Sequence, residues 1–148
     1  EGLLILESEN KGKSTWVSAD DVRFLMQDGR ITQTSGLNNN LTDLIFPDSV
    51  QGLPQETQNF IIYYSYDFPF LSALKVKISR KYLGKVKVNL ASGPKELHYV
   101  EEVIHNKEIG WRANNKYWLD EENFVWKSEQ QISPKLPNIK YEVTKKPS

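Results

Sequence analysis

The feature that most constrains this chain is a regular succession of short apolar or alternating runs separated by turn residues. Such runs recur about every ten residues, which is typical of antiparallel β structure. Successive side chains of a strand point to opposite faces, so an alternating run can bury one face of a sheet. Aromatic residues, which favour strands, are frequent, with 4 Trp, 7 Tyr and 6 Phe. The pattern predicts an all-β, antiparallel fold.

The clearest local prediction is a hairpin in which Asp28 and Gly29 join the runs 22–27 and 30–34. An Asp-Gly pair accepts the positive φ angles that a tight type I′ turn requires. The following stretch, 35–56, is interrupted by Asn, Gly and Pro residues and is predicted to be one long loop crossing an end of the sheet. Its composition also allows a short helix near 38–47, with an Asn as N-cap.

From Ala73 onward the runs follow one another as a meander. Residues 75–78 and 85–88 alternate Lys with Val or Ile, and Gly84 lies near their connection, so they are predicted to pair as a hairpin. Asn114-Asn115 is predicted to form a tight turn further along. Together these hairpins predict a large antiparallel sheet, closed or partly closed as a barrel, with a β-sandwich as the alternative. The 148 residues are expected to form a single domain, 1–148.

The charge balance argues against some classes of partner. Lys plus Arg and Asp plus Glu each number 19, so bulk attraction to nucleic acid or to an anionic membrane is not expected. The chain has no Cys, which excludes disulfides and thiolate metal sites within it. No apolar run approaches the roughly 18 residues needed to span a bilayer.

The titratable residues do not predict an active site. His98 and His105 are seven residues apart on one predicted strand, and an odd spacing places them on opposite faces. Glu101 and Glu102 are neighbours on that strand, so they cannot act jointly as acid and base. Motifs of serine hydrolases, zinc hydrolases, phosphate loops and dinucleotide sites are absent from the sequence. We therefore expect no enzyme activity, no metal and no cofactor.

Lysines of the predicted hairpin are the first candidates for ligand binding. Its register would set Lys77 opposite Lys85 and Lys75 opposite Lys87, and like charges facing each other destabilise a sheet. Two explanations are open. A glutamate at 101 or 102 on the next strand neutralises Lys85, or the basic face meets an anionic polymer such as an acidic polysaccharide. Outward lysines also protect sheets against edge association.

Aromatic residues near the C-terminus are the second candidates. Tyr117 and Trp118 are neighbours with opposite orientations, so one of them is expected to face outward. An outward aromatic ring is suited to stacking on a sugar, although most of the aromatic residues between 111 and 126 are expected in the core. The candidate binding residues are therefore Lys75, Lys77, Lys85, Lys87, Tyr117 and Trp118.

Three segments share a pattern with one known family. The first is Gly-Arg-Ile to Thr-Ser-Gly-Leu at 29–37, and the second is Tyr-Asp-Phe-Pro at 66–69. The third and most specific contains Asn115, Tyr117, Trp118, Asp120, Val125, Trp126, Lys127, Ser128, Gln130 and Pro134. Together they resemble the YjbF/GfcB family of outer-membrane lipoproteins that accompany bacterial capsule and exopolysaccharide export. One departure is Asn123-Phe124, where a Gly often precedes the Val-Trp-Lys-Ser segment of the family.

The resemblance implies a non-catalytic periplasmic domain that is anchored to the outer membrane by a lipid upstream of Glu1. It implies a role in export or assembly of a surface polysaccharide, through binding to the polymer or to a protein of the export machinery. Two alternatives stay open: a barrel that carries a lipid or other apolar ligand, and a homo-oligomeric scaffold. An empty apolar cavity would favour the carrier, and a filled core with an outer basic or aromatic groove would favour the binding module. An exposed apolar face would favour the scaffold.

Overall fold

A computed structural model describes residues 4–47, 50–67 and 70–147, and the regular elements in these ranges are strands. In chain order they are β1 (Leu4–Asn10), β2 (Lys13–Ser18), β3 (Arg23–Gln27), β4 (Arg30–Ser35), β5 (Leu41–Ile45), β6 (Gln58–Asp67), β7 (Phe70–Leu90), β8 (Gly93–Asn106), β9 (Trp111–Leu119), β10 (Val125–Gln130) and β11 (Ile139–Glu142). Among the described residues, no helix is long and apolar enough to cross a membrane.

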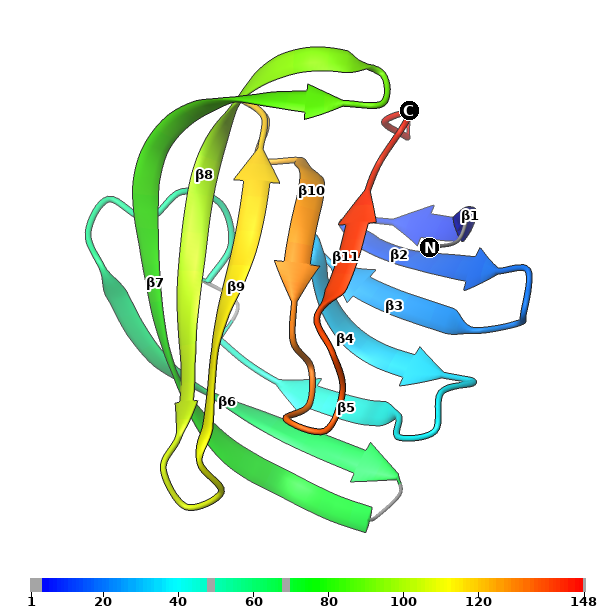
Figure 1. The fold of residues 1–148 in the computed structure, drawn as a ribbon, viewed down its shortest axis with the longest axis vertical. Coiled ribbons are helices and arrows are strands. Elements are labelled where there is room, and N and C mark those ends of the chain that lie inside the picture. The colour runs from blue at the N-terminus through cyan, green and yellow to red at the C-terminus, as the bar shows by residue number, and fades with distance from the viewer. Residues whose placement is uncertain (1–3, 48–49, 68–69, 148) are drawn as a thin grey trace. The chain divides into compact units, whose positions relative to one another are not determined.

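The strands form two antiparallel sheets (Figure 1). One has the order β1-β2-β3-β4 and the other has the order β11-β10-β9-β8-β7-β6-β5. Neighbours in sequence are therefore neighbours in space, which is the definition of a meander. From Val76 onward, β7 to β10 curve together as a half-barrel (Figure 1). The predicted all-β fold, with a large antiparallel meander partly closed as a barrel, is confirmed.

The chain divides into two compact units. The first contains Glu1–Ile45 and Tyr63–Lys75, and it includes the four-stranded sheet. The second contains Phe46–Ile62 and Val76–Ser148, and it includes β8 to β11 with most of β7. The single domain expected from the sequence stays a prediction.

The Asp-Gly hairpin is confirmed. Asp28 and Gly29 have φ angles of 50° and 85°, as a type I′ turn requires, and they connect β3 to β4. Gln27 lies opposite Arg30, next to the turn. The two turn residues, which accept positive φ angles, therefore determine this connection.

The predicted hairpin between 75–78 and 85–88 is wrong, because both runs belong to the single strand β7. Gly84 has a φ angle of 100° and forms a bulge rather than a turn. The pairing of β7 with β8 shifts there: Tyr82 lies opposite Val100, and Lys85 lies opposite His98. A bulge and a tight turn both need a residue that accepts positive φ, so the glycine alone does not distinguish them.

The short helix considered near 38–47 is also wrong. Its centre is β5, in which Leu41 lies opposite Tyr66 and Leu44 lies opposite Tyr64 of β6. Leu41 and Leu44 are buried, so strand pairing and burial outweigh the local helix signal. The side chain of Asn40 is not an N-cap: its Oδ1 accepts hydrogen bonds from the Leu37 N–H and from the hydroxyl of Thr34.

Asn114-Asn115 lies inside β9, so the tight turn predicted there is wrong. Asn115 is buried, and its Oδ1 accepts a hydrogen bond from the Gln131 N–H at 2.9 Å. The side chain thus has a tertiary partner that the local sequence does not reveal. The Phe68-Pro69 part of the second family segment lies outside the described residues.

The interior side of the half-barrel is occupied by the chain itself. Val100, Tyr117, Leu119 and Val125 form a buried cluster. Leu53, from the loop between β5 and β6, packs against it. The loop expected from the Gly, Pro and Asn content of 35–56 is interrupted by β5, and the described residues between β4 and β5 and after β5 in this stretch are irregular. Filling by Leu53 leaves the outer face of the strands for contact with other molecules.

Candidate functional site

A buried ion pair lies on the interior side of β7 and β8. Arg80 and Glu102 are 3% and 0% exposed, and Arg80 Nη1 donates to Glu102 Oε2 at 2.9 Å. Arg80 Nη2 donates to the carbonyl of Gly52 at 2.6 Å, and the Tyr117 hydroxyl donates to Glu102 Oε1 at 3.1 Å. Each charge thus has partners from other segments. The arrangement connects the loop that carries Gly52 to three strands and is structural.

Further polar side chains, on β10 and β11, are hydrogen bonded within the protein. Gln130 Nε2 donates to Ser128 Oγ at 2.9 Å, and Ser128 Oγ donates to the Lys116 carbonyl at 2.7 Å. Burial raises the pKa of Tyr141, which is hydrogen bonded to Ser128. These groups use their hydrogen-bonding capacity within the protein, so they support the fold.

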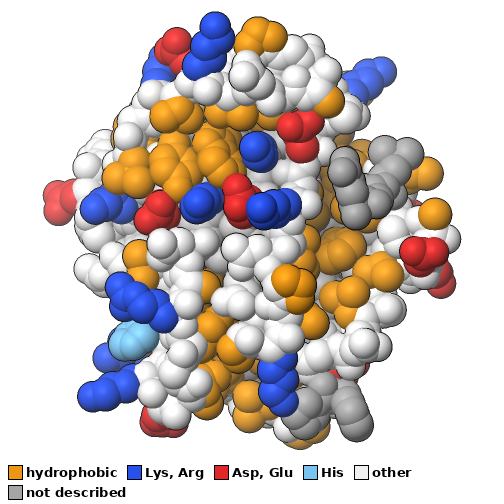
Figure 2. All heavy atoms as spheres, in the orientation of Figure 1, with side chains coloured by type: hydrophobic (Ala, Val, Ile, Leu, Met, Phe, Trp, Pro, Cys, Tyr) orange, Lys and Arg blue, Asp and Glu red, His pale blue; other side chains and the backbone are white. Residues whose placement is uncertain are grey.

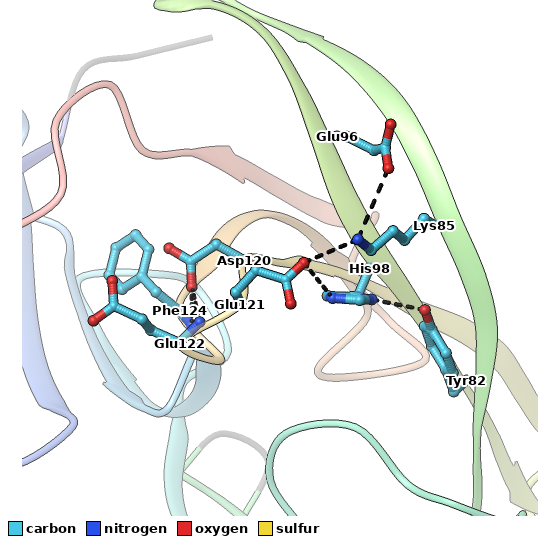
Figure 3. Close-up of polar contacts among 8 residues, drawn as sticks. All are labelled: Tyr82, Lys85, Glu96, His98, Asp120, Glu121, Glu122 and Phe124. Atoms are coloured by element: carbon cyan, nitrogen blue, oxygen red, sulfur yellow. Dashed lines mark hydrogen bonds and ion pairs between the residues drawn. The ribbon is translucent and has the colours of Figure 1, made fainter.

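A chain of polar contacts leads from the interior to the surface (Figure 3). The Tyr82 hydroxyl lies 2.7 Å from His98 Nδ1, and His98 Nε2 lies 3.0 Å from Glu121 Oε1. The same Glu121 oxygen lies 3.2 Å from Lys85 Nζ, and Glu96 lies 3.9 Å from that ammonium group. The buried imidazole therefore bridges a phenol of β7 and an exposed carboxylate of the β9–β10 turn.

The charges in this chain of contacts neutralise one another. Hydrogen bonds from His98 and Lys85 lower the pKa of Glu121, and the hydrogen bond to Glu121 raises the pKa of Lys85. Both imidazole nitrogens have protein partners. Within the residues that the structure describes, no group of three or more His, Cys, Asp or Glu side chains could hold a metal ion.

Asp120 organises the adjoining turn between β9 and β10. Its Oδ1 accepts from the N–H groups of Glu122 and Phe124, and its Oδ2 accepts from Trp126 Nε1 and Lys146 Nζ. Burial alone would raise the pKa of Asp120, but these hydrogen bonds lower it overall. Asn123 has a φ angle of 65°, so an asparagine takes the left-handed conformation where the family often has glycine. The departure noted in the sequence is thus compatible with the turn.

A row of alternating charges crosses the outer face of the second unit; we call it the charge row. It consists of Lys81 on β7, Glu101 on β8, Lys116 on β9, Glu129 on β10 and Lys140 on β11, each opposite the next. Figure 2 shows blue and red side chains alternating across this face. Opposite charges on adjacent strands attract, so each lysine of the row has a carboxylate beside it.

A second row lies beside the charge row, and we call it the aromatic row. It contains Tyr99 on β8, Trp118 on β9 and Lys127 on β10, which are aligned in register. The rings of Tyr99 and Trp118 stack with their centroids 5.1 Å apart, and Lys127 Nζ lies 5.2 Å from the Trp118 centroid. Leu83, in the β7 bulge opposite Tyr99, is 45% exposed and extends the row. Figure 2 shows an apolar patch next to the alternating charges.

The predicted lysines are distributed along one strand rather than across two. Lys75 belongs to the first unit, and Lys77, Lys85 and Lys87 belong to the second. The glutamate that neutralises Lys85 comes from the β9–β10 turn, not from position 101 or 102. Lys87 lies opposite Glu96. The expected juxtaposition of four lysines is therefore absent from β7, and a binding role for them stays a prediction.

Tyr117 and Trp118 have opposite orientations, as predicted. Tyr117 is 2% exposed, whereas Trp118 is half-buried on the outer face. His98 and His105 also lie on opposite sides of β8, with His98 buried and His105 half-buried. The sequence did not predict that Tyr99, Leu83 and Lys127 lie in one row with Trp118. Their alternation assigns them to a face, but only the register between strands places them in one row.

Comparison with known proteins identifies the family. The family model described as "Group 4 capsule polysaccharide lipoprotein gfcB, YjbF" matches residues 2–143. Among solved structures, the hypothetical lipoprotein YmcC from Escherichia coli K12 has a TM-score of 0.78 at 20% sequence identity, covering 99% of this chain and 78% of that chain. At this identity the structural similarity supports the fold alone. No curated protein sequence matches the chain.

The family match spans both units and nearly the whole chain. It includes the β9–β10 segment, where Tyr117 and Ser128 face the interior, Asp120 forms the turn and Trp118 and Lys127 face outward. The sequence resemblance, the family model and the fold therefore agree: the chain belongs to the YjbF family of group 4 capsule polysaccharide lipoproteins.

Proposed function

We propose that this chain is a non-catalytic periplasmic domain that assists the export or assembly of a capsule or exopolysaccharide. It acts by binding the polysaccharide or a protein of the export machinery, and an N-terminal lipid holds it at the outer membrane. Membership of a capsule lipoprotein family associates the chain with the cell envelope. The observation that carries the proposal is the family match over residues 2–143, because its description names both a capsule polysaccharide and a lipoprotein.

The arrangement of polar groups supports a binding role over a catalytic one. General acid–base chemistry needs a titratable group that can reach a substrate. Here Arg80 is engaged by Glu102 and Gly52, and His98 is engaged on both nitrogens by Tyr82 and Glu121. The outer face instead presents half-exposed aromatic and charged side chains, which are the groups that recognise sugars and protein surfaces.

The interior also supports a binding module over a carrier of apolar ligands. Leu53 packs on the core cluster, and a buried ion pair lies on the same side of the sheet. An apolar ligand placed there would have to displace Leu53 and would contact charged groups, which is unfavourable.

A direct test is a calorimetric or NMR titration of the whole chain with the surface polysaccharide of the source bacterium. The native chain would be compared with a variant in which Lys75, Lys77, Lys85 and Lys87 are all changed to Glu, at low and moderate salt. Saturable binding by the native chain supports the proposal, and its loss in the variant would support these lysines as the site. If the native chain does not bind the polymer, binding of polysaccharide is wrong, and a protein of the export machinery is the remaining partner.

A further inference from the structure

Trp118 differs from the other tryptophans in the hydrogen bonding of its indole. The indole N–H groups of Trp16, Trp111 and Trp126 donate to Ser14, Gln131 and Asp120 at 2.9, 2.9 and 3.0 Å. Within the described ranges, the Trp118 indole N–H has no protein acceptor. Its ring is half-buried on the outer face, so a donor and an apolar ring edge are both available to a ligand.

Lys127 contacts an aromatic ring rather than a carboxylate, although Glu142 of β11 lies opposite it in register. Glu142 Oε2 instead accepts a hydrogen bond from the Ala91 N–H at 2.9 Å. Lys127 instead contacts the Trp118 ring, and among the residues that the structure describes no carboxylate lies within ion-pair distance of its ammonium group. It is therefore a cation that an external anion can approach without displacing a protein carboxylate.

These two groups lie side by side on adjacent strands. Two donors, one of them charged, require acceptor oxygens on the ligand, and one acceptor should be an anionic group. The neighbouring Tyr99 ring and Leu83 provide apolar surface, against which the C–H face of a sugar ring can pack. In the charge row beside them, two glutamates lie between the three lysines, so the row adds little attraction for additional negative charges.

We propose that Trp118 and Lys127 form a binding site for an acidic sugar residue, with the indole N–H on a sugar oxygen and the ammonium group on the carboxylate. Tyr99 and Leu83 form its apolar floor. This inference rests on the proposed function, since it names the site and the chemical class of a polysaccharide ligand. It assigns the attraction to one lysine on β10 rather than to the lysines of β7.

The test compares single conservative variants of the whole chain. Trp118→Phe keeps an aromatic ring but removes the N–H, and Lys127→Met keeps the aliphatic stem but removes the charge. Trp16→Phe and Lys13→Met are matched controls, because they make the same chemical changes on β2 of the four-stranded sheet. The probes are the surface polysaccharide of the source bacterium, oligogalacturonate, and oligogalacturonate whose carboxyl groups have been reduced to alcohols.

Calorimetry measures affinity, and ¹⁵N NMR follows the four indole N–H signals, with that of Trp118 assigned by its absence in Trp118→Phe. We expect the Trp118 signal to shift most and Trp118→Phe to weaken binding by about three- to ten-fold. Lys127→Met should weaken binding of the acidic probe by about two- to five-fold and leave the reduced probe unchanged. Both controls should bind as the native chain does.

Three outcomes decide the inference. The inference is supported if Trp118→Phe and Lys127→Met weaken binding while both controls bind as the native chain does. If the native chain binds the bacterial polysaccharide but both variants bind equally well, the site is wrong and the proposed function stands. If the native chain binds none of the three probes, polysaccharide binding itself is wrong, and the site is overturned with it.

Discussion

Replacing Glu102 by Gln should destabilise the protein strongly, although the two side chains have nearly the same shape. Glu102 is 0% exposed, and its carboxylate is the charge partner of Arg80, which is 3% exposed. In the variant, the guanidinium group stays buried and charged, and it faces an amide instead of an anion. Removing one partner of a buried ion pair typically costs about 3–5 kcal/mol.

This free energy converts into a shift of the melting temperature. Unfolding entropy is about 2.1 cal/mol/K per residue near 60 °C, so 148 residues give about 0.3 kcal/mol/K. A loss of about 3–5 kcal/mol then lowers Tm by about 10–16 °C. Thermal unfolding followed by circular dichroism measures this shift, and urea unfolding checks that the m-value is unchanged.

A double-mutant cycle separates the ion pair from other effects of the substitution. Arg80→Met and Glu102→Gln should each destabilise strongly, and the double variant should be more stable than their sum predicts, by about 1–3 kcal/mol. Glu129→Gln is the control, because its pairing with the exposed Lys140 should contribute about 1 kcal/mol or less. The argument would be refuted if Glu102→Gln lowered Tm by less than about 3 °C. It would also be refuted if the destabilisation of the double variant equalled the sum of the two single variants.

Two further predictions concern the turn and the bulge. Asp120→Asn should destabilise by about 1.5–3 kcal/mol at neutral pH, because four donors lose a charged acceptor. The folded-state pKa of Asp120 lies below its ordinary value of 3.8, so its stabilisation is present above that pH and is lost as the pH falls through the folded pKa. Urea midpoints measured from pH 7 to pH 2 should therefore converge for Asp120→Asn and the native protein at the acid end, and a constant difference would contradict this. Gly84→Ala should lower the free energy of unfolding by about 1–2 kcal/mol. The cause is the φ angle of 100° alone, because a Cβ at this position meets no atom within 4 Å. An unchanged urea midpoint would show that the bulge relaxes without strain.

Much of the fold could be predicted because the determining signals are local. Asp28-Gly29 specifies a turn by its φ angles, and the alternation of apolar residues specifies strands. Gly84 could not be interpreted in this way, because a glycine between two alternating runs suits a hairpin and a bulge equally. The short helix predicted near Leu41 is wrong for a different reason. This segment is a strand because it pairs with Tyr64 and Tyr66, which lie some twenty residues further along the chain.

The buried ion pair was missed, although the sequence contains a signal for it. Val76, Ile78 and Arg80 share one face of β7, and Val100, Glu102 and Ile104 share one face of β8. Each of these apolar faces contains one charged residue, and the two charges have opposite signs. Once the strands are known to be neighbours, this pattern predicts a buried ion pair. Register between strands was the missing information, and it also decides which side chains accompany Trp118.

The period-two alternation of strands β9 and β10 explains why structural and binding residues are interleaved in one segment. Tyr117 and Ser128 point inward, where the Tyr117 hydroxyl donates to Glu102 and the Ser128 hydroxyl donates to the Lys116 carbonyl. Their sequence neighbours Trp118 and Lys127 point outward and contact each other. Substitutions of inward residues would alter binding only by disturbing the fold, because their polar groups already have protein partners. Outward residues can change without loss of these hydrogen bonds. A binding phenotype that appears at outward positions while unfolding midpoints stay constant is therefore the signature that separates recognition from stability in this segment.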